Sequence, residues 1–367
     1  MKTIGIICEY NPFHNGHIYH INKIKEIYPN SLIILILNGY FLERGEISIL
    51  TKEDKTKIAL ENNIDIVLEL PTFWGCQSAD TFASKSLEIL NHFKIDELIF
   101  GSECNDITTL KNIALKQLDN NFDDNVKMYL DKGLNYPSAL AKACNIDFTF
   151  NPNDLLGISY IKAILKNNYN IKATTIKRTN DYHDTKLNDK IISASNIRKK
   201  IKNKENIKKY LPKSSLKNIK IVNEDIYFKL LKAKIITDNN LNTYLDVDKG
   251  LDYRLKKYIN EANNLEEFIN KIKTKRYTYN RLNRMFIHIL LGITKDTYDL
   301  EYIKILGFNK HGQKYIKSIN NELSIPKTII PMSKTYNTEL KASLIYDLIC
   351  NTNTYMYELK NKPIIKN

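Results

Sequence analysis

The chain has 367 residues, 43% of them hydrophobic, and a formal net charge of +14, which fits two or three domains with buried cores. No apolar run approaches the roughly 18 residues that cross a bilayer, and the first residues lack the layout of a signal peptide, so we expect a soluble, cytoplasmic protein with no membrane partner. The five cysteines are widely spaced and form no CxxC pair, which argues against a structural zinc site or a disulfide framework.

The first hundred residues alternate between apolar, strand-like runs and segments with helical periodicity. The expected strands are Thr3 to Cys8, Leu32 to Leu37, Ile64 to Leu70 and Glu97 to Phe100. The expected helices are Gly16 to Ile27, Lys55 to Asn62 behind a Thr51 cap, and Ala79 to Phe93. Strands separated by helices predict an α/β fold with a Rossmann-like, doubly wound parallel sheet.

Two histidines separated by a glycine follow the first expected strand, in the stretch Glu9-Tyr10-Asn11-Pro12-Phe13-His14-Asn15-Gly16-His17. A helix begins there, and its free N–H groups and positive dipole end suit phosphate. Gly16 allows a phosphate or adenosine to approach the backbone closely. His14 and His17 lie one helical turn apart, so both can give hydrogen bonds or positive charge to a leaving pyrophosphate. The pattern therefore predicts a site for a nucleoside triphosphate.

Two other interpretations of these histidines remain open. His14, His17 and His20 have a spacing that can present three imidazoles to a metal ion, although no carboxylate or cysteine completes the ligand set and Gly16 would be unexplained. The histidines can also be ordinary core residues. We expect no protein-held metal.

Ligands of doubly wound sheets bind at the carboxyl ends of the strands, near the point where the strand order reverses. Three segments follow expected strands and are predicted to converge there: the His14–His17 loop, Asn38-Gly39 and Gly101-Ser102-Glu103.

Residues 105–150 have a polar, helical pattern. The turn Asn151 to Asp154 caps an expected helix from Leu155 to Leu165, and an expected strand follows at Ala173 to Ile176. The segment Ile192 to Arg198 then combines hydroxyl side chains, a helix start and an arginine, which together can form an anion cradle. Alone, this segment is equally typical of an ordinary helix cap. Together with the upstream histidine motif, it is typical of HxGH nucleotidyltransferases, whereas the absence of GxxxxGK[ST] excludes a P-loop.

The alternation stops near residue 205, and the remaining patterns, including Arg281 to Leu291, are mostly helical. We therefore predict a nucleotidyltransferase-like domain at 1–205 and a basic helical domain at 206–367. Residues 1–200 hold 24 Lys and Arg against 24 Asp and Glu, whereas residues 201–367 hold 31 against 17. A basic module beside a neutral one favours a polyanionic substrate such as nucleic acid. The alternative is a lysine-rich, solvated surface.

Over nearly its whole length the sequence resembles the bacterial tRNA(Met) cytidine acetate ligases. The resemblance begins with Glu9 to His17 and continues through further motifs: Gly39, Arg44-Gly45-Glu46, Glu69-Leu70-Pro71, Gln77-Ser78-Ala79, Phe100 to Glu103, Asn153 to Tyr160, Arg178, Ser193 to Arg198, Lys275 to Thr278 and Arg281 to Arg284. The chain departs from the family pattern at Tyr40, Glu43 and Ile47, where Asn, Gln and Pro are expected. These departures affect the expected acetate or cytidine pocket.

The resemblance implies a two-step reaction. ATP and acetate form acetyl-adenylate and pyrophosphate, and the acetyl group then passes to N4 of the wobble cytidine of elongator tRNA(Met). The implied catalytic residues are His14 and His17, which stabilise charge on the phosphates. Mg²⁺ is expected with ATP, held mainly by phosphates and water.

The resemblance also implies binding residues. Those for ATP are Ile7, Cys8, Glu9, Tyr10, Asn11, Pro12, Phe13, His14, Asn15, Gly16, His17, Ile18, Tyr19, His20, Gly101, Asn153, Arg178, Ser193, Ser195 and Arg198. Those for tRNA are Lys275, Arg276, Arg281 and Arg284. Simpler roles are alternatives for several of them: a strand end for Gly101, a helix cap for Asn153, and solvated surface charges for Arg178 and the four basic residues.

Two rival functions remain. A small-molecule adenylyltransferase or cytidylyltransferase would leave the uneven charge distribution unexplained. A non-catalytic RNA-binding protein with a degenerate nucleotide pocket would not need His14, Gly16, His17, Ser193 and Arg198.

Overall fold

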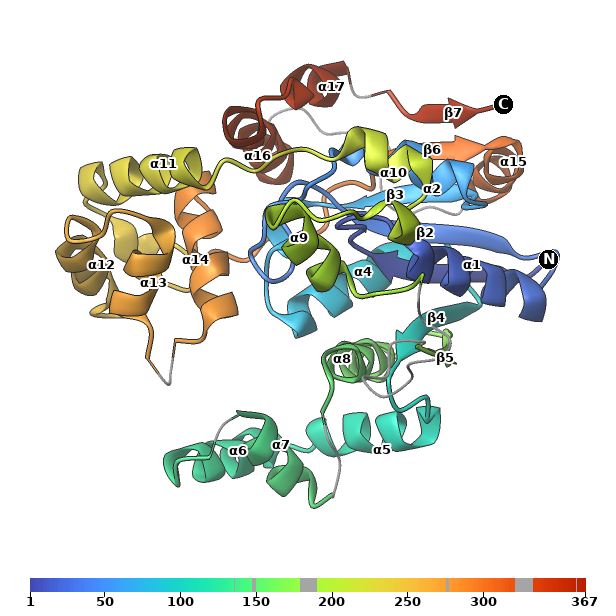
Figure 1. Ribbon diagram of the computed structural model, residues 1–367. Helices are drawn as coiled ribbons and strands as arrows, with labels where there is room; N and C mark the ends of the chain where they lie inside the picture. Colours follow the sequence, from blue (N-terminus) through green and yellow to red (C-terminus); the bar gives the residue numbers. More distant parts are fainter. Residues whose placement is uncertain (135, 147–149, 179–189, 275–276, 321–332, 361) are drawn as a thin grey trace.

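A computed structural model describes the chain except for residues 135, 147–149, 179–189, 275–276, 321–332 and 361. A central sheet of seven strands has the order β5-β4-β1-β2-β3-β6-β7 and carries helices on both faces (Figure 1). None of the helices in the described ranges is both long and apolar enough to cross a bilayer.

Five parallel strands form the predicted doubly wound core of this sheet: β1 (Thr3–Cys8), β2 (Leu32–Asn38), β3 (Ile66–Leu70), β4 (Glu97–Ser102) and β5 (Lys172–Lys177). The helices that connect them are α1 (Asn15–Ile27), α2 (Lys52–Glu61), α3 (Thr72–Gly75), α4 (Ala79–His92) and α8 (Pro152–Lys166). Because β1 pairs with both β2 and β4, the strand order reverses between β1 and β4. The carboxyl end of β1 is therefore the expected ligand site.

The continuous apolar run of β2 is explained by burial on both faces. Ile34 and Ile36 belong to one hydrophobic core, whereas Ile33 and Leu35 belong to the core on the opposite face. All four side chains are fully buried. This pattern is typical of a central parallel strand covered by helices on both sides.

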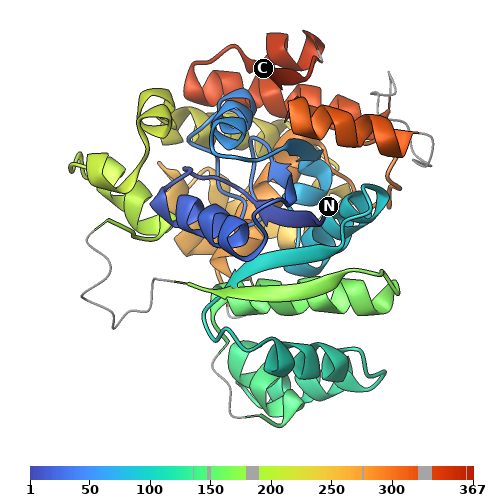
Figure 2. The same cartoon turned by 90° about the vertical axis from the view of Figure 1, so that its right-hand side faces the viewer.

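Helices also fill the predicted polar segment between β4 and α8. They are α5 (Ile107–Gln117), α6 (Phe122–Asp131) and α7 (Tyr136–Cys144). Figure 2 shows them as a lobe below β5, away from the rest of the sheet.

The second half of the chain is mostly helical, as predicted. Its helices are α9 (Ala194–Lys202), α10 (Lys213–Asn218), α11 (Glu224–Thr237), α12 (Leu251–Ile259), α13 (Leu265–Ile272), α14 (Tyr279–Leu291), α15 (Lys310–Ile319), α16 (Lys334–Cys350) and α17 (Thr354–Lys360). Helices α11 to α14 lie together at the end of the sheet opposite the N-terminus (Figure 1). The carboxyl end of β1 consequently points toward them.

Two strands from the second half complete the sheet, and the sequence patterns did not indicate them. β6 (Ile305–Asn309) pairs antiparallel with β3, and β7 (Ile364–Lys366) pairs parallel with β6. Both are short, and tertiary pairing rather than local pattern decides such strands. The domain boundary near residue 205 stays a prediction, and the sheet takes strands from both sides of it.

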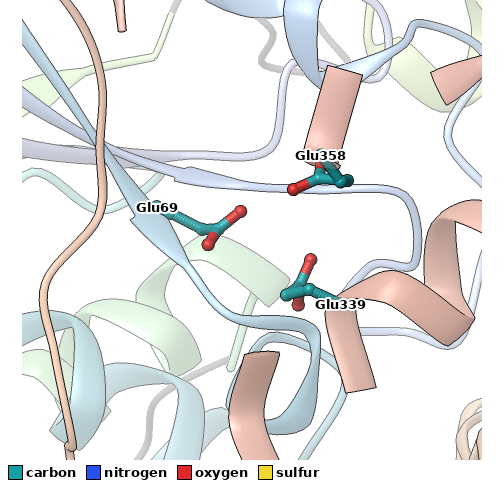
Figure 3. A group of neighbouring side chains, drawn as sticks. All are labelled: Glu69, Glu339 and Glu358. Carbon is teal, nitrogen blue, oxygen red and sulfur yellow. The ribbon is translucent and has the colours of Figure 1, made fainter. Parts of the chain in front are cut away.

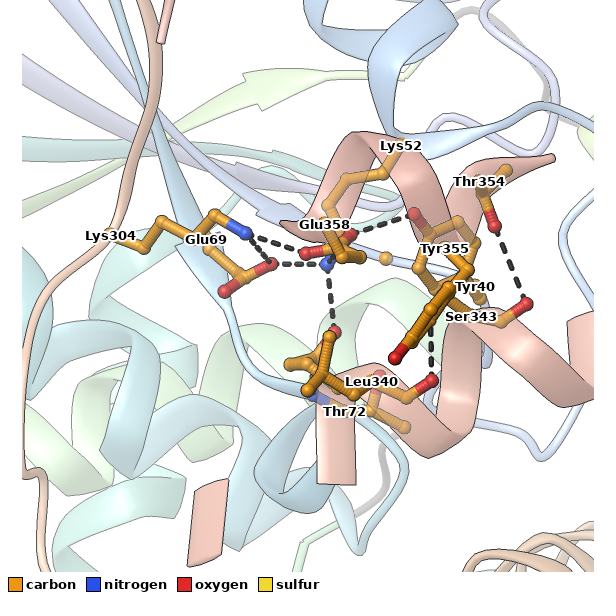
Figure 4. Close-up of polar contacts among 12 residues, drawn as sticks. Tyr40, Lys52, Glu69, Thr72, Lys304, Leu340, Ser343, Thr354, Tyr355 and Glu358 are labelled. Atoms are coloured by element: carbon orange, nitrogen blue, oxygen red, sulfur yellow. Dashed lines mark hydrogen bonds and ion pairs between the residues drawn. The ribbon is translucent and has the colours of Figure 1, made fainter. Parts of the chain in front are cut away.

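A buried ionic cluster attaches α16 and α17 to the sheet. We call it the Lys52 cluster: Lys52, Glu69, Lys304, Glu339 and Glu358. The three carboxylates point toward one another (Figure 3), and the Lys52 ammonium lies among them (Figure 4). Lys52 Nζ contacts Glu69 and lies 2.7 Å from Glu339 and 2.8 Å from Glu358. Lys304 adds a second cation, 2.6 Å from Glu358.

Candidate functional site

The two motif histidines form a reciprocal cap at the start of α1. His14 Nδ1 accepts the Gly16 N–H at 3.0 Å, and His17 Nδ1 accepts the His14 N–H at 3.1 Å. A neutral imidazole that accepts at Nδ1 carries its hydrogen on Nε2. Both rings are therefore Nε2–H donors at the N-terminus of a helix that follows β1.

Burial keeps all three clustered histidines neutral. Burial and the nearby charges of Arg178 and Arg198 lower the pKa of His14 to about 3. Burial and the neighbouring His14 ring, whose centroid is 4.0 Å away, lower the pKa of His17 well below its usual value. Burial and Arg178 lower the pKa of His20 to about 4. The sequence left open whether these imidazoles give hydrogen bonds or positive charge to a phosphate. Their lowered pKa values favour hydrogen bonds from neutral rings.

The Lys52 cluster contains the carboxylates that meet the spacing for a metal ion within the described residues: Glu69, Glu339 and Glu358. The Lys52 ammonium already lies among them and supplies the positive charge. The Nδ1 atoms of His14 and His17 accept hydrogen bonds within the cap. Only the Nε2 atoms of these two rings remain to contact a ligand bound at the histidine motif.

Gly16 is required by the cap itself. A Cβ at this position would lie 2.7 Å from Cε1 and 2.9 Å from Nδ1 of His14. We expect Gly16→Ala to displace the His14 ring and to lower acetate-dependent ATP–pyrophosphate exchange by at least about tenfold, because one misplaced group at a reacting centre costs that much or more. Gly133→Ala is a control with open space around the added methyl group, although its φ of +88° adds strain. Equal exchange rates in G16A and the native protein would contradict this role.

The histidine motif and the Ser193–Arg198 segment lie in contact. Ser193 caps α9, and its Oγ accepts the Asn196 N–H at 3.2 Å. Arg198 Nη1 donates to the Asn11 carbonyl at 2.8 Å. Asn15 Nδ2 donates to the carbonyls of Lys190 and Lys209, both at 2.9 Å, which fixes the loop from the other side. Ser195 lies exposed in the first turn of α9.

Gly101, Asn153 and Arg178 also lie together, beside the end of β4. Arg178 Nη1 is 3.4 Å from Asn153 Oδ1, and Arg178 Nε is 3.7 Å from Glu103. A Cβ on Gly101 would lie 3.2 Å from Arg178 Cγ. These contacts favour a shared site over separate roles as a strand end, a helix cap and a solvated charge.

Asp154 holds the end of β4 in place beside Asn153. The sequence alone did not identify it as a site residue. Its buried carboxylate accepts the Ser102 hydroxyl at 2.5 Å and the Glu103 N–H at 3.0 Å. The only sequence signal for this role was its place beside Asn153 in a familial motif.

The remaining predicted ATP residues belong to the same loop or its flanks. Ile7 and Cys8 end β1, and Ile18, Tyr19 and His20 lie in the first two turns of α1. Tyr10, Pro12 and Phe13 are buried in the loop between them. The Tyr10 and Phe13 rings pack against His17, with centroids 4.7 Å and 5.4 Å away.

Glu9 and Glu43 form a carboxylate pair that the sequence analysis did not predict. Glu9 Oε1 accepts from Asn38 Nδ2 at 3.1 Å and from the Glu43 N–H at 2.7 Å. Burial raises the pKa of Glu9, and burial together with the Glu9 charge raises the pKa of Glu43 to about 7. Below this pair, buried Lys55 Nζ donates to the carbonyls of Glu9, Asn38 and Gly39, which holds the ends of β1 and β2 together.

The three departures from the family pattern have different surroundings. The Tyr40 hydroxyl donates to Glu358 at 2.7 Å, so this side chain joins the Lys52 cluster. Ile47 forms an isolated β-bridge with Phe41 that closes the loop after β2. Glu43, at the tip of that loop, lies beside Glu9.

Two of the predicted tRNA-binding arginines make ion pairs within the chain. Arg281 Nη2 lies 3.0 Å from both carboxylate oxygens of Asp248. Arg284 is largely buried, and its Nη1 lies 3.6 Å from the Glu43 carboxylate. Lys275 and Arg276 lie outside the described residues.

Comparisons with known proteins identify the family of this chain. The HIGH Nucleotidyl Transferase family model matches residues 1–362. A tRNA(Met) cytidine acetate ligase of Caldicellulosiruptor saccharolyticus is 38% identical over 95% of this chain and 94% of its own. One of Fusobacterium nucleatum is 37% identical over 100% and 99%. The crystal structure of Thermotoga maritima TmcAL bound with alpha-thio ATP has a TM-score of 0.86 at 25% identity, covering 100% of this chain and 99% of that one. The chain therefore belongs to the HIGH nucleotidyltransferase family and, within it, to the tRNA(Met) cytidine acetate ligases.

Proposed function

We propose that this protein activates acetate with ATP and acetylates N4 of the wobble cytidine of elongator tRNA(Met). Acetate attacks the α-phosphorus of ATP, which gives acetyl-adenylate and pyrophosphate. The cytidine amine then attacks the acetyl carbonyl and releases AMP. The relatives that match over nearly their whole length are named tRNA(Met) cytidine acetate ligases, and the structural relative was crystallised with an ATP analogue. A tRNA-modifying role also agrees with the expected cytoplasmic location.

The observation that carries the first step is the histidine cap of α1. It presents two neutral Nε2–H donors at the positive dipole end of a helix. Preorganised donors of this kind stabilise the charge that develops on transferring phosphates. Arg178 and Arg198, which lie close enough to lower the pKa of His14, add positive charge for the triphosphate. We place Mg²⁺ on the phosphates and water, because the carboxylate set that fits a metal already surrounds Lys52.

The test is a reconstitution with labelled acetate, ATP and elongator tRNA(Met), followed by digestion of the RNA. We expect labelled N4-acetylcytidine, formed only when all three substrates are present. Pyrophosphate release on a small substrate, with no RNA labelling, would favour the adenylyltransferase or cytidylyltransferase. Absence of any ATP turnover would favour the non-catalytic RNA-binding protein.

For tRNA binding we propose Lys275, Arg276, Arg281 and Arg284 of the basic half. We expect Arg281→Ala to weaken tRNA binding and to reduce the slope of log affinity against log salt by about 1, because one phosphate contact is lost. Acetate-dependent ATP–pyrophosphate exchange should persist. Affinity is measured by filter binding over a salt series.

Asp248→Asn is the matched control for this variant. It breaks the same ion pair but keeps the Arg281 charge. Tight tRNA binding by D248N with weak binding by R281A supports a phosphate contact. Equal losses in both variants would show that only the ion pair matters and would contradict the assignment.

A further inference from the structure

The carboxyl ends of β1 and β2 carry a carboxylate, Glu9, which is named above among the implied ATP-binding residues and to which the proposed first step gives no chemical role. Glu9 follows β1 in the histidine motif, and Asn38, which hydrogen-bonds it, ends β2. The loop after β2 brings Glu43 to the same point and continues to Gly45. Because Gly45 has no Cβ, the loop can pack against the backbone of α14 at Asn283 and Arg284, where a Cβ would collide with backbone atoms. Glu9, the first residue of the histidine motif, therefore contacts the loop that packs against the helical half of the chain.

We infer that Glu9 accepts the proton from the cytidine N4 amine during acetyl transfer, and that Glu43 positions it. This inference rests on the proposed function. The amine nitrogen forms a bond to the acetyl carbon, and the bond from that carbon to the phosphate oxygen of acetyl-adenylate breaks. AMP leaves with the electron pair, and the amine proton passes to the Glu9 carboxylate.

The hydrogen bonds of Glu9 leave one oxygen for this proton. Among the described residues, two groups donate hydrogen bonds to the Glu9 carboxylate, Asn38 Nδ2 and the Glu43 N–H, and both donate to Oε1. They hold the plane of the carboxylate, while Oε2 keeps its lone pairs. Arg284 holds Glu43 in turn, because its Nη1 lies 3.5 Å from the Glu43 carbonyl and 3.6 Å from the Glu43 carboxylate. A chain of contacts thus connects α14 to Glu9.

Burial is the main reason that Glu9 is a better base than a solvated carboxylate, whereas the charges around it act in both directions. The charged and titratable groups come from the loop after β2, from α2, from α8, from α9 and from α14: Glu43, Arg44, Glu46, Lys55, Tyr160, Arg198 and Arg284. Arg198 Nη2 lies 2.6 Å from Glu46, and Lys55 Nζ donates to three carbonyls. Burial and the Glu46 charge raise the pKa of Glu9. A base whose pKa is raised toward the working pH is more efficient.

Glu9→Gln tests the proton transfer. Glutamine keeps an Oε1 acceptor for Asn38 and for the Glu43 N–H, but its amide is too weak a base to take the amine proton. We expect transfer of acetyl from preformed acetyl-adenylate to tRNA to fall by about 100-fold, and acetate-dependent ATP–pyrophosphate exchange to fall far less. The exchange also reports that the variant is folded. Glu53→Gln, on the outer side of α2, is the matched control and should not alter either step.

The pH profile tests the role of Glu43. In the native protein the transfer rate should rise with pH as Glu9 loses its proton, and then level off. Glu43→Gln removes a like charge but keeps the backbone N–H, so the rise should move to lower pH. A flat profile in E9Q and a shifted one in E43Q support the inference.

Equal losses of exchange and transfer in E9Q would overturn the inference. It would also be overturned if the pH profile of transfer in E9Q or in E43Q were the same as in the native protein. Failure of the native protein to form N4-acetylcytidine would instead overturn the proposed function, and this inference with it. The two failures are distinct because the second appears before any variant is made.

Discussion

Lys52→Met should lower the free energy of unfolding by about 3 to 5 kcal/mol, the usual cost of removing one partner from a buried ion pair. Methionine matches the stem of the lysine but leaves the buried carboxylates of Glu69, Glu339 and Glu358 with one cation fewer. The Lys52 side chain is itself fully buried, so water does not replace the lost charge.

Urea unfolding followed by circular dichroism measures this loss. Lys57→Met is the matched control, because Lys57 lies on the same helix and makes an exposed pair with Glu53. Surface substitutions of this kind change stability by no more than about 0.5 kcal/mol. A K52M midpoint equal to that of K57M would show that the cluster does not stabilise the fold.

The cluster should also make stability depend on acid pH. Burial alone would raise the pKa of Glu358, but Lys52 and Lys304 lower it to about 2. A carboxyl with a folded-state pKa below its unfolded value stabilises the fold above the unfolded pKa and loses that contribution as pH falls toward the folded pKa. The buried Glu69, whose pKa is raised by burial, offsets part of this effect. Stability should therefore fall between about pH 4.5 and about pH 2, and less steeply in K52M.

His14→Asn should reduce acetate-dependent ATP–pyrophosphate exchange by about 100- to 1,000-fold, the cost of losing one preorganised donor to a developing charge. Asparagine is a good N-cap, so its side chain can keep the start of α1 intact while the Nε2–H donor disappears. Stability should therefore change by less than about 1 kcal/mol.

Exchange of labelled pyrophosphate into ATP measures this effect. His92→Asn, in the last turn of α4, is the control and should retain full exchange. Since the pKa of His14 is about 3, exchange in the native protein should show no rise or fall from this histidine between pH 5 and 8. A strongly destabilised H14N, or one with native exchange, would contradict the donor role.

The sequence predicted the parts of the fold that local pattern decides. The strand Thr3–Cys8 and the caps at Thr51 and Ser193 lie where the patterns indicated. The two motifs that the sequence analysis paired, the histidine motif and the Ser193–Arg198 segment, are in contact. These features follow from periodicity, cap residues and motif spacing, which act over a few residues.

The unpredicted features depend on contacts between distant residues. Lys52 and Glu339 are 287 positions apart, and nothing near Lys52 indicates that it is buried. β6 is recognisable as a strand only because β3 leaves an edge to pair with. Arg281 and Arg284 suggested an exposed basic helix face, whereas Asp248 and Glu43, which pair with them, lie in other segments.

The pairing of β6 with β3 has a consequence for synthesis of the protein on the ribosome. Residues 1–205 contain the whole histidine motif, yet β3 remains an open edge until β6 has emerged, and Lys52 lacks Glu339 and Glu358 until still later. An unpaired strand edge can associate with other chains. Proteins truncated before β6 should therefore aggregate rather than persist as a free nucleotide-binding fragment.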